Sequence, residues 1–373
     1  MKNLKRRQLL IFSFFIVIFL FFFFLFHYFR TQIQNNSLIS GEDKAVSSPQ
    51  ATPSNGLSPT ALANVFSGNQ KKNNLDIGAW VWKSPLEISD DTWREWLSFC
   101  KEEGIQSLYL DIGSVADIEE LHDSSQRKEK EDAFTKRLQI LVAQAAKEGV
   151  KVQGLAGNNT WADPAYYYIP EKIVGFVASY NQASPPESRL AGMQFDIEPY
   201  QQPAFENAGS RPKILQNFFR LLERLTDLMK NNAPDVQFGI AVPYWLDGES
   251  DRAQPLSWNG HSQVPVFHVM DIMARFSHAY MVILDYRDTA DGKNGSIEHA
   301  SGELAYARAH TSNLRVLIGQ ETSYTKPASI SFHGHPKADF KKALVALVRA
   351  FSDNPSFGGF AIHHLESYIQ MRE

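Results

Sequence analysis

Cysteine is nearly absent from this chain, because Cys100 is the only one among 373 residues. A single thiol excludes an internal disulfide framework and any zinc site built from cysteines. Cys100 ends the helix-like run 93–100, which indicates a buried thiol rather than a nucleophile. Cysteine chemistry is therefore not expected to carry the function.

The chain also lacks a marked excess of either charge. Its 37 lysines and arginines against 41 aspartates and glutamates give a formal net charge of −4. This slight acidity argues against a nucleic-acid backbone as a partner. A glycine-rich phosphate loop is missing too, since the glycines in 292–295 do not connect a strand to a helix as such a loop requires.

The one long hydrophobic run lies at the N-terminus. Residues 9–29 are largely apolar and follow a basic stub, 1–8, that holds four lysines and arginines. The run is longer than the roughly 7–15 residues of a signal-peptide core and is about long enough to cross a bilayer. We expect an uncleaved single-pass membrane anchor, with the stub in the cytoplasm and the bulk of the chain outside. Cleavage near residues 40–41 is the alternative.

The composition changes twice after this anchor. Residues 30–74 are rich in serine, asparagine, glutamine and proline and show little apolar periodicity. Such a segment is expected to be a disordered linker between the membrane and the remaining chain. Residues 75–373 then alternate between strand-like and helix-like patterns, which predicts a folded domain of roughly 300 residues.

Eight strand-like segments make up this domain, and each but the last is followed by a helix-like segment. The strands are expected at 76–82, 106–112, 150–156, 192–198, 236–245, 280–286, 314–320 and 357–363. Such alternation implies a parallel sheet, which closes most economically as a (β/α)₈ TIM barrel. Only 368–373 remain for the last helix, so we expect it to be reduced or missing, with the region near residue 61 as its replacement. An open doubly wound sheet is the alternative fold.

Two acids stand at the end of the fourth predicted strand. Asp196 and Glu198 are two residues apart and therefore point to the same side of a strand, which Pro199 is suited to end. Neighbouring carboxyls repel when both are charged, so one holds its proton more tightly and can act as a general acid near neutral pH. The alternative is a structural acidic pair bonded to a nearby lysine or arginine.

Glu321 follows the seventh predicted strand, which lies across the barrel mouth from the fourth. Catalytic groups of such barrels lie at the C-terminal ends of the strands. Two facing carboxyls suit glycosidic cleavage, because one protonates the leaving oxygen while the other attacks the sugar carbon or activates water. We predict Glu198 and Glu321 as the catalytic couple, with Asp196 tuning Glu198. The alternative for Glu321 is a rim residue bonded to Arg287 or Lys326.

Polar and aromatic residues gather at the other strand ends as well. Sugar rings lay their C–H faces on tryptophan and tyrosine, so this pattern predicts a polysaccharide or oligosaccharide substrate and requires no cofactor. Each aromatic residue has core packing as its alternative role. The candidate substrate-binding residues are Trp80, Trp82, Asp111, Asn158, Trp161, Trp245, Asp285, Tyr286, Gln320 and His363.

A metal site is not expected, although His363 and His364 are adjacent at the end of the eighth predicted strand. Neighbouring residues on a strand point to opposite faces, so only one of the two can enter the site. The remaining histidines fall elsewhere than at predicted strand ends. One of the pair is therefore expected to hydrogen-bond the substrate.

These motifs resemble three groups of barrel proteins. Glu198-Pro199 and Glu321 resemble the clan of retaining (β/α)₈ glycosidases, whose strand-four Asn-Glu-Pro carries the acid/base; Ile197 replaces that Asn here. Asp196-Ile197-Glu198 with Asp285-Tyr286 resembles the family 18 chitinases. The segments 195–200, 284–290 and 360–364 resemble bacterial barrel proteins classed as glycosidase-like.

The resemblance implies three functional hypotheses. The first is a membrane-anchored glycoside hydrolase that acts on an extracytoplasmic or cell-wall polysaccharide. The second is a substrate-assisted hydrolase of N-acetylated sugars, in which Glu198 and Asp196 are central and Glu321 binds the substrate. The third is a non-catalytic glycan-binding barrel.

Overall fold

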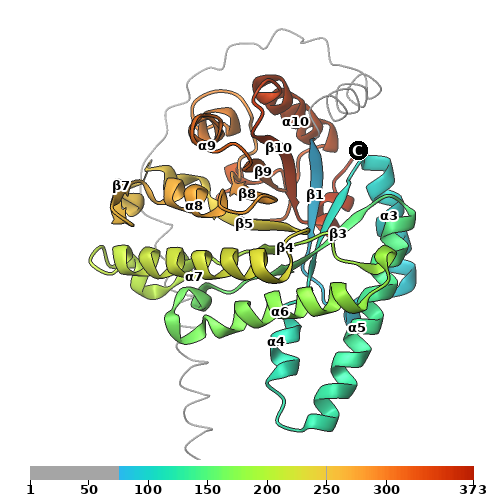
Figure 1. The fold of residues 1–373 in the computed structure, drawn as a ribbon. Helices are drawn as coiled ribbons and strands as arrows, with labels where there is room; N and C mark the ends of the chain where they lie inside the picture. The colour runs from blue at the N-terminus through green and yellow to red at the C-terminus, as the bar shows by residue number, and fades with distance from the viewer. Residues whose placement is uncertain (1–74, 249) are drawn as a thin grey trace, which may run out of the picture. The chain divides into compact units, whose positions relative to one another are not determined.

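The fold is a closed barrel of eight parallel strands, seen in the computed structural model (Figure 1), which describes residues 75–248 and 250–373. Around the barrel the strand order is β1-β10-β9-β8-β5-β4-β3-β2, and β1 pairs with β10 to close it. The predicted TIM barrel is thus confirmed, and closure rules out the open sheet. The barrel strands are β1 (Asp76–Val81), β2 (Ser107–Asp111), β3 (Lys151–Ala156), β4 (Gly192–Phe195), β5 (Gln237–Pro243), β8 (Ala279–Leu284), β9 (Arg315–Glu321) and β10 (Phe357–His363).

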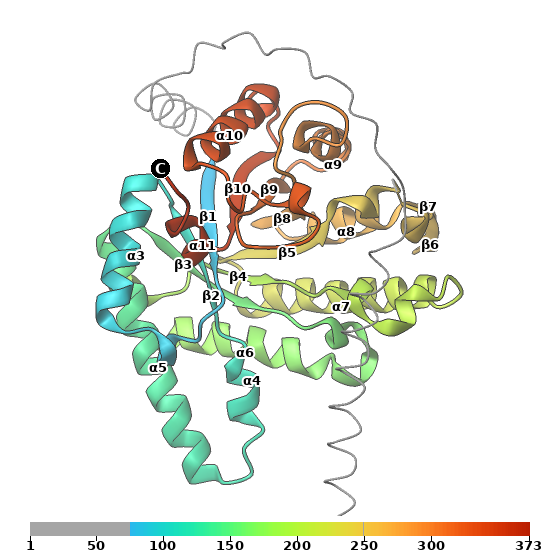
Figure 2. The ribbon, with the colours of Figure 1, turned by 180° about the vertical axis from the view of Figure 1, so that it is seen from behind.

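Helices surround the strands on the outside of the barrel (Figures 1 and 2). The first, α3, begins after the cap Ser89, whose side chain accepts from the Thr92 amide, and ends at Gly104 in the left-handed conformation. These capping residues fix both ends of the helix. The major helices are α3 (Asp90–Glu103), α5 (Ser124–Lys147), α6 (Tyr168–Ala183), α7 (Arg211–Asn232), α8 (Pro265–Met273), α9 (Ser296–His310) and α10 (Lys337–Phe351).

The helix after the last strand is reduced, as predicted, to the five residues of α11 (Leu365–Ile369). Its Tyr368 ring packs edge-on against Phe99 of α3 and Phe340 of α10, with both centroid distances 5.2 Å. The Tyr368 hydroxyl donates to Glu103 at 2.6 Å, and Lys341 of α10 pairs with the same carboxyl at 2.8 Å. The short helix therefore fills the space between the first and last major helices.

A short α-helix and a β-hairpin were not predicted. A short helix, α4 (Ser114–Glu119), follows β2, and a hairpin of β6 (Leu256–Trp258) and β7 (His261–Gln263) lies between β5 and β8. The hairpin turns at Asn259 and Gly260, which have φ values of 50° and 82°. An Asn-Gly pair favours this tight turn because both residues tolerate positive φ. That dipeptide is the sequence signal through which the hairpin could have been predicted.

The barrel interior is more polar than the branched aliphatic filling usual for this fold. Trp80 donates to Gln194, Gln194 donates to the Tyr280 hydroxyl at 3.1 Å, and that hydroxyl donates to Gln153 at 2.8 Å. A Cβ on Gly239 would stand 2.2 Å from the Tyr280 ring, so only glycine leaves room for that ring. A hydrogen-bonded column therefore fills the barrel axis.

The predicted stub, anchor and linker, 1–74, lie outside the described residues, as does the region near residue 61. Within 75–248 and 250–373, the helices fall short of the length and apolar character that a bilayer crossing demands.

Candidate active site

Acidic and aromatic side chains from separate strands converge at the C-terminal mouth of the barrel. Nδ1 of His363, at the end of β10, lies 2.8 Å from Oε2 of Glu321 on β9. The ring of Tyr286, after β8, lies 5.9 Å from the His363 ring. Burial raises the pKa of Tyr286 well above its usual value, and the charges of Asp196, Glu321 and Glu198 raise it further. These five side chains therefore form one cluster, called the acid cluster below.

Glu198 is held by donors that follow it directly in sequence. β4 ends at Phe195, and a short 3₁₀ turn, Pro199–Gln201, begins immediately after Glu198. The Tyr200 hydroxyl and the Gln201 amide donate to its two carboxyl oxygens. Burial raises the pKa of Glu198 above its usual value, while the Tyr200 and Gln201 hydrogen bonds act against that rise. Glu198 is thus oriented by its neighbours and inclined to keep its proton.

Asp196 lies two residues before Glu198 and directly follows β4. Its Oδ1 is buried without a hydrogen-bond partner among the described residues. Burial, and then the charge of Glu198, raise the pKa of Asp196 well above its usual value. The two acids therefore resist being charged together, which was the expectation from their spacing.

The pKa of Glu321 shifts in the opposite direction, downward, although its side chain is only 5% exposed. Burial acts to raise its pKa, but donors from His363 and Ser323 outweigh burial and hold the pKa below its usual value. The Ser323 amide and hydroxyl donate to Oε1 at 2.6 and 2.7 Å. Environments that push two carboxyls in opposite directions fit one as an acid and the other as an ionised group.

Two aromatic residues border the cluster. Trp82, which follows β1, is 37% exposed, and its indole nitrogen donates to Nε2 of His363 at 3.0 Å. Trp245, after β5, is half-buried and meets the Tyr200 ring at 5.2 Å with an interplanar angle of 78°. The Arg252 guanidinium lies 4.9 Å from the Trp245 ring centroid. Trp82 therefore offers exposed ring surface near the acids, whereas the Trp245 ring is packed against Tyr200 and Arg252.

Two other predicted platforms are core residues. Trp80 is 1% exposed inside the barrel, two residues before Trp82, and bonds Gln194 below the mouth. Trp161 is 7% exposed and packs edge-on against Phe195, on the outer side of the barrel wall. Their assignment as sugar platforms is corrected, because neither offers an open ring face.

Asp285 and Gln320 also need correction, because their side chains point away from the barrel axis. Asp285 is fully buried and pairs with His299 of α9 at 3.0 Å. Gln320 donates to the Asp285 carbonyl at 2.7 Å and to Ser296 of α9 at 3.2 Å. Side chains alternate along a strand, so the neighbours of the inward-facing Tyr286 and Glu321 must face the helices.

Asp111 and Asn158 hold local turns. Asp111 Oδ1 accepts from the Gly113 amide at 2.8 Å, where α4 begins, and burial raises its pKa. Asn158 is exposed and caps a 3₁₀ turn through the Thr160 amide. The donors Tyr200, Gln201 and Ser323 were missed in the sequence. Their spacing of two or three residues after a predicted catalytic acid was the available signal.

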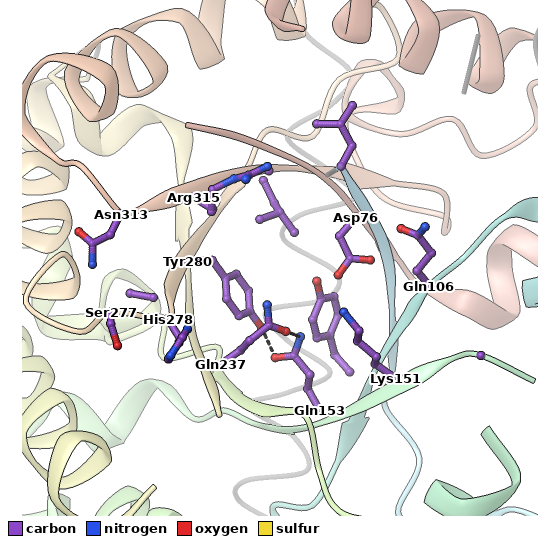
Figure 3. A pocket seen from close by; sticks show the side chains of 16 residues that line it. Asp76, Gln106, Lys151, Gln153, Gln237, Ser277, His278, Tyr280, Asn313 and Arg315 are labelled. Carbon is purple, nitrogen blue, oxygen red and sulfur yellow. Dashed lines mark hydrogen bonds between the residues drawn. The ribbon is translucent and has the colours of Figure 1, made fainter. Parts of the chain in front are cut away.

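A cavity of about 570 Å³ opens at the opposite, N-terminal mouth of the barrel. Figure 3 shows side chains from several strand starts around it, with Tyr280 and Gln153 at its floor. Among them, Asp76 accepts from the Ser107 hydroxyl at 2.6 Å, and Lys151 and Arg315 act on its pKa. This cavity is separate from the acid cluster, which lies at the other ends of the same strands.

Solved structures of glycoside hydrolases are among those similar to this chain. A family GH5_18 structure from Streptomyces cattleya, in complex with GlcNAc, is 14% identical, with 78% of this chain and 70% of that chain covered and a TM-score of 0.51. The exo-beta-1,4-mannosidase Op5Man5 from Opitutaceae bacterium strain TAV5 is 12% identical, with 78% and 52% covered and a TM-score of 0.49. PbGH5A, a family 5 enzyme from Prevotella bryantii, is 12% identical, with 81% and 93% covered and a TM-score of 0.48.

This chain spans about half the length of the mannosidase, and at these identities the likeness concerns the (β/α)₈ fold of glycoside hydrolases. No protein-family model and no curated protein matches the chain.

Proposed function

We propose that this protein is a glycoside hydrolase that uses Glu198 as proton donor and Glu321 as nucleophile. The observation that carries the proposal is the pair of opposite pKa shifts within one cluster. Burial raises the pKa of Glu198, whereas donors to Glu321 keep its pKa low despite burial. A proton donor and an ionised carboxylate are the two groups that glycosidic cleavage requires.

The residues fit a two-step retaining reaction. Glu198 gives its proton to the glycosidic oxygen while the Glu321 carboxylate attacks the anomeric carbon, which forms a glycosyl ester and frees the alcohol. Glu198, now ionised, takes a proton from water as that water breaks the ester, and both acids return to their starting states. Asp196 resists ionisation beside Glu198, and the exposed Trp82 offers a ring face for the sugar.

The substrate is proposed to be an extracytoplasmic or cell-wall polysaccharide. This part of the proposal depends on residues 9–29 acting as a single-pass anchor with the barrel outside the cytoplasm. Deletion of residues 1–29 should move the protein from the membrane fraction to the soluble fraction, as measured by immunoblotting. Equal partition of the deleted and complete chains would contradict the anchor.

A second candidate is substrate-assisted cleavage of N-acetylated sugars, in which the acetamido oxygen attacks in place of Glu321. The raised pKa of Asp196, two residues before Glu198, favours this candidate. It predicts inhibition by a thiazoline mimic of the cyclised sugar and retention of activity in Glu321 variants. GlcNAc is also bound in the Streptomyces cattleya structure, so N-acetylglucosaminides belong among the test substrates.

The deciding experiment assays the full chain on a panel of nitrophenyl glycosides, with and without azide. Glu321→Gly should be inactive, and azide should restore turnover by forming a glycosyl azide, because the small anion replaces the missing nucleophile. Glu198→Ala should lose more activity on a poor leaving group than on dinitrophenol, which needs no proton.

Glu148→Gln is the matched control, since Glu148 forms only an exposed ion pair with Lys101 at 3.3 Å. Full activity in Glu321→Gly would transfer the proposal to the substrate-assisted mechanism. If the wild type binds glycans but cleaves none of the substrates, the hypothesis of a non-catalytic glycan-binding barrel is favoured.

A further inference from the structure

A continuous hydrogen-bonded chain connects Trp82 at the surface to the buried carboxyl of Glu321. The Trp82 indole N–H donates to Nε2 of His363 at 3.0 Å, and Nδ1 of the same ring faces Glu321 Oε2 at 2.8 Å. Indole is a donor only, so Nε2 must accept and carries no proton. A neutral imidazole then has its proton on Nδ1, where it donates to Glu321.

Packing holds the His363 ring in this orientation. The Trp80 ring meets it edge-on at 5.7 Å, and the Tyr286 ring lies at 5.9 Å with a 37° angle. The His363 side chain is 24% exposed, while that of Glu321 is 5% exposed. The ring therefore lies between the exposed tryptophan and the buried acid and cannot turn over without breaking both hydrogen bonds.

We propose that His363 is a positioning residue whose tautomer is set by Trp82, so that Nδ1–H is permanently presented to Glu321. The proposal rests on the proposed function, in which Glu321 attacks the sugar. It gives Trp82 two tasks, since the ring face offers a surface for sugar and the ring edge fixes His363. Removal of the indole N–H should therefore disturb Glu321 even when the ring face is kept.

The charged and titratable groups around His363 come from several elements. Glu321 on β9 and Tyr286 after β8 face it directly, and Glu198 lies close enough that a charge on His363 would lower its pKa. His364 meets it edge-on at 5.4 Å, and the Lys83–Glu366 ion pair acts on His364 behind it.

Substitutions of Trp82 and His363 separate the two tasks. Trp82→Phe keeps an aromatic face but removes the donor, so KM should change little while kcat falls. His363→Leu removes the donor to Glu321, so kcat/KM should fall about 10- to 100-fold, as expected for a hydrogen bond to a charged group. Its acidic limb should move to higher pH, because Glu321 loses a bond that favours its ionised form. His363→Asn, which can place an amide N–H near Nδ1, should restore most of the activity.

Trp258→Phe is the matched control, because its indole N–H donates to Glu223 of α7, away from the acid cluster, at 3.4 Å. It should leave the pH profile of kcat/KM unchanged. An identical profile in the wild type and His363→Leu would overturn the proposal.

A second measurement does not depend on activity. ¹⁵N NMR of histidine-labelled full chain in detergent should show the Nδ1–H tautomer for the resonance that disappears in His363→Asn. Trp82→Phe should abolish that preference. An Nε2–H tautomer in the wild type would overturn the inference and leave the glycosidase proposal standing. If the Nδ1–H tautomer is found but the protein cleaves no glycan, the hydrogen-bonded chain from Trp82 to Glu321 is supported. The glycosidase proposal is then contradicted.

Discussion

The two mouths of this barrel are both polar, but the acidic side chains at each mouth have different charged neighbours. At the N-terminal mouth, Asp76 accepts from Ser107, and the charges of Lys151 and Arg315 act to lower its pKa. At the C-terminal mouth, three carboxyls share one cluster. Within the described part of the chain, neither a lysine nor an arginine contributes to the pKa shifts of these carboxyls.

This difference is a better guide to the active site than cavity size. Acids that face cations are explained by structure alone, whereas acids crowded together cost stability unless the arrangement serves chemistry. The cavity of about 570 Å³ lies at the N-terminal mouth, away from the crowded acids. We therefore propose that the chemistry takes place at the C-terminal mouth, and the following predictions test that proposal.

The largest expected effect comes from removing the proton donor. Glu198→Gln should lower kcat/KM by about 10²- to 10⁴-fold, the usual contribution of a general acid. The melting temperature should change little, because the amide can still accept from Tyr200. Steady-state kinetics and thermal unfolding measure both. Loss of turnover in Asp76→Asn, with Glu198→Gln still active, would place the chemistry at the N-terminal mouth and contradict the proposal.

A crowding substitution in the barrel axis should act on stability alone. In Gly239→Ala the new Cβ would stand 2.2 Å from the Tyr280 ring, which is buried and cannot move freely. Overpacking of this kind costs about 1–3 kcal/mol of the free energy of unfolding. Urea denaturation measures the loss, and kcat per folded molecule should be unchanged.

Gly175→Ala in α6 is the control for that substitution, because its Cβ would meet nothing within 4 Å. It should stabilise the protein by about 0.4–1 kcal/mol through the unfolded chain. Equal loss in both variants would show that the column of side chains is not tightly packed.

Loss of the donor beside Glu198 should change the pH profile more than the rate. Tyr200 donates to Glu198 and thereby opposes the rise in its pKa that burial causes. Tyr200→Phe should raise that pKa further, so the acid stays protonated to higher pH and the alkaline limb of kcat/KM moves upward. The rate at neutral pH should change less than about tenfold, the size of one hydrogen bond. An alkaline limb that moves downward would contradict the assignment of Glu198 as the acid.

The smallest effect is expected at the N-terminal mouth. Burial raises the pKa of Asp76 in the folded protein, so the charged form costs stability at pH values above the folded pKa and the cost disappears in acid. Asp76→Asn removes the charge and should therefore raise the free energy of unfolding at pH 7, by about 0.5 kcal/mol. The difference from wild type should shrink as the pH falls toward 4. Chemical denaturation at several pH values checks the trend, and an increasing difference in acid would contradict it.

Much of the fold could be predicted because local signals agreed with it. The bounds of α3 follow from its caps Ser89 and Gly104, and the strand bodies are apolar runs between helices. The crowded pair of Asp196 and Glu198 followed from their spacing alone. These features depend on residues that are close in sequence.

The failures came from features that local patterns do not contain. Asp285 and Gln320 were assigned to the site because they stand at the ends of predicted strands, but the local sequence does not show which of two neighbouring residues faces the barrel axis. Trp161 was predicted as a platform because it is an aromatic residue that follows a predicted strand. Its contact with Phe195, which belongs to another strand, is not visible in the local sequence. The N-terminal cavity is built from residues on distant strands, so no local pattern predicts it.

The reduced final helix has a practical consequence. Tyr368 of α11 joins α3 to α10, and the Lys337 amide donates to the Arg372 carbonyl at 2.6 Å. Residues 368–372 thus hold α3 and α10 together beside the paired strands β1 and β10. Truncation before Leu365 would remove these contacts between α3 and α10. A purification tag fused at Glu373 would lie directly beside them.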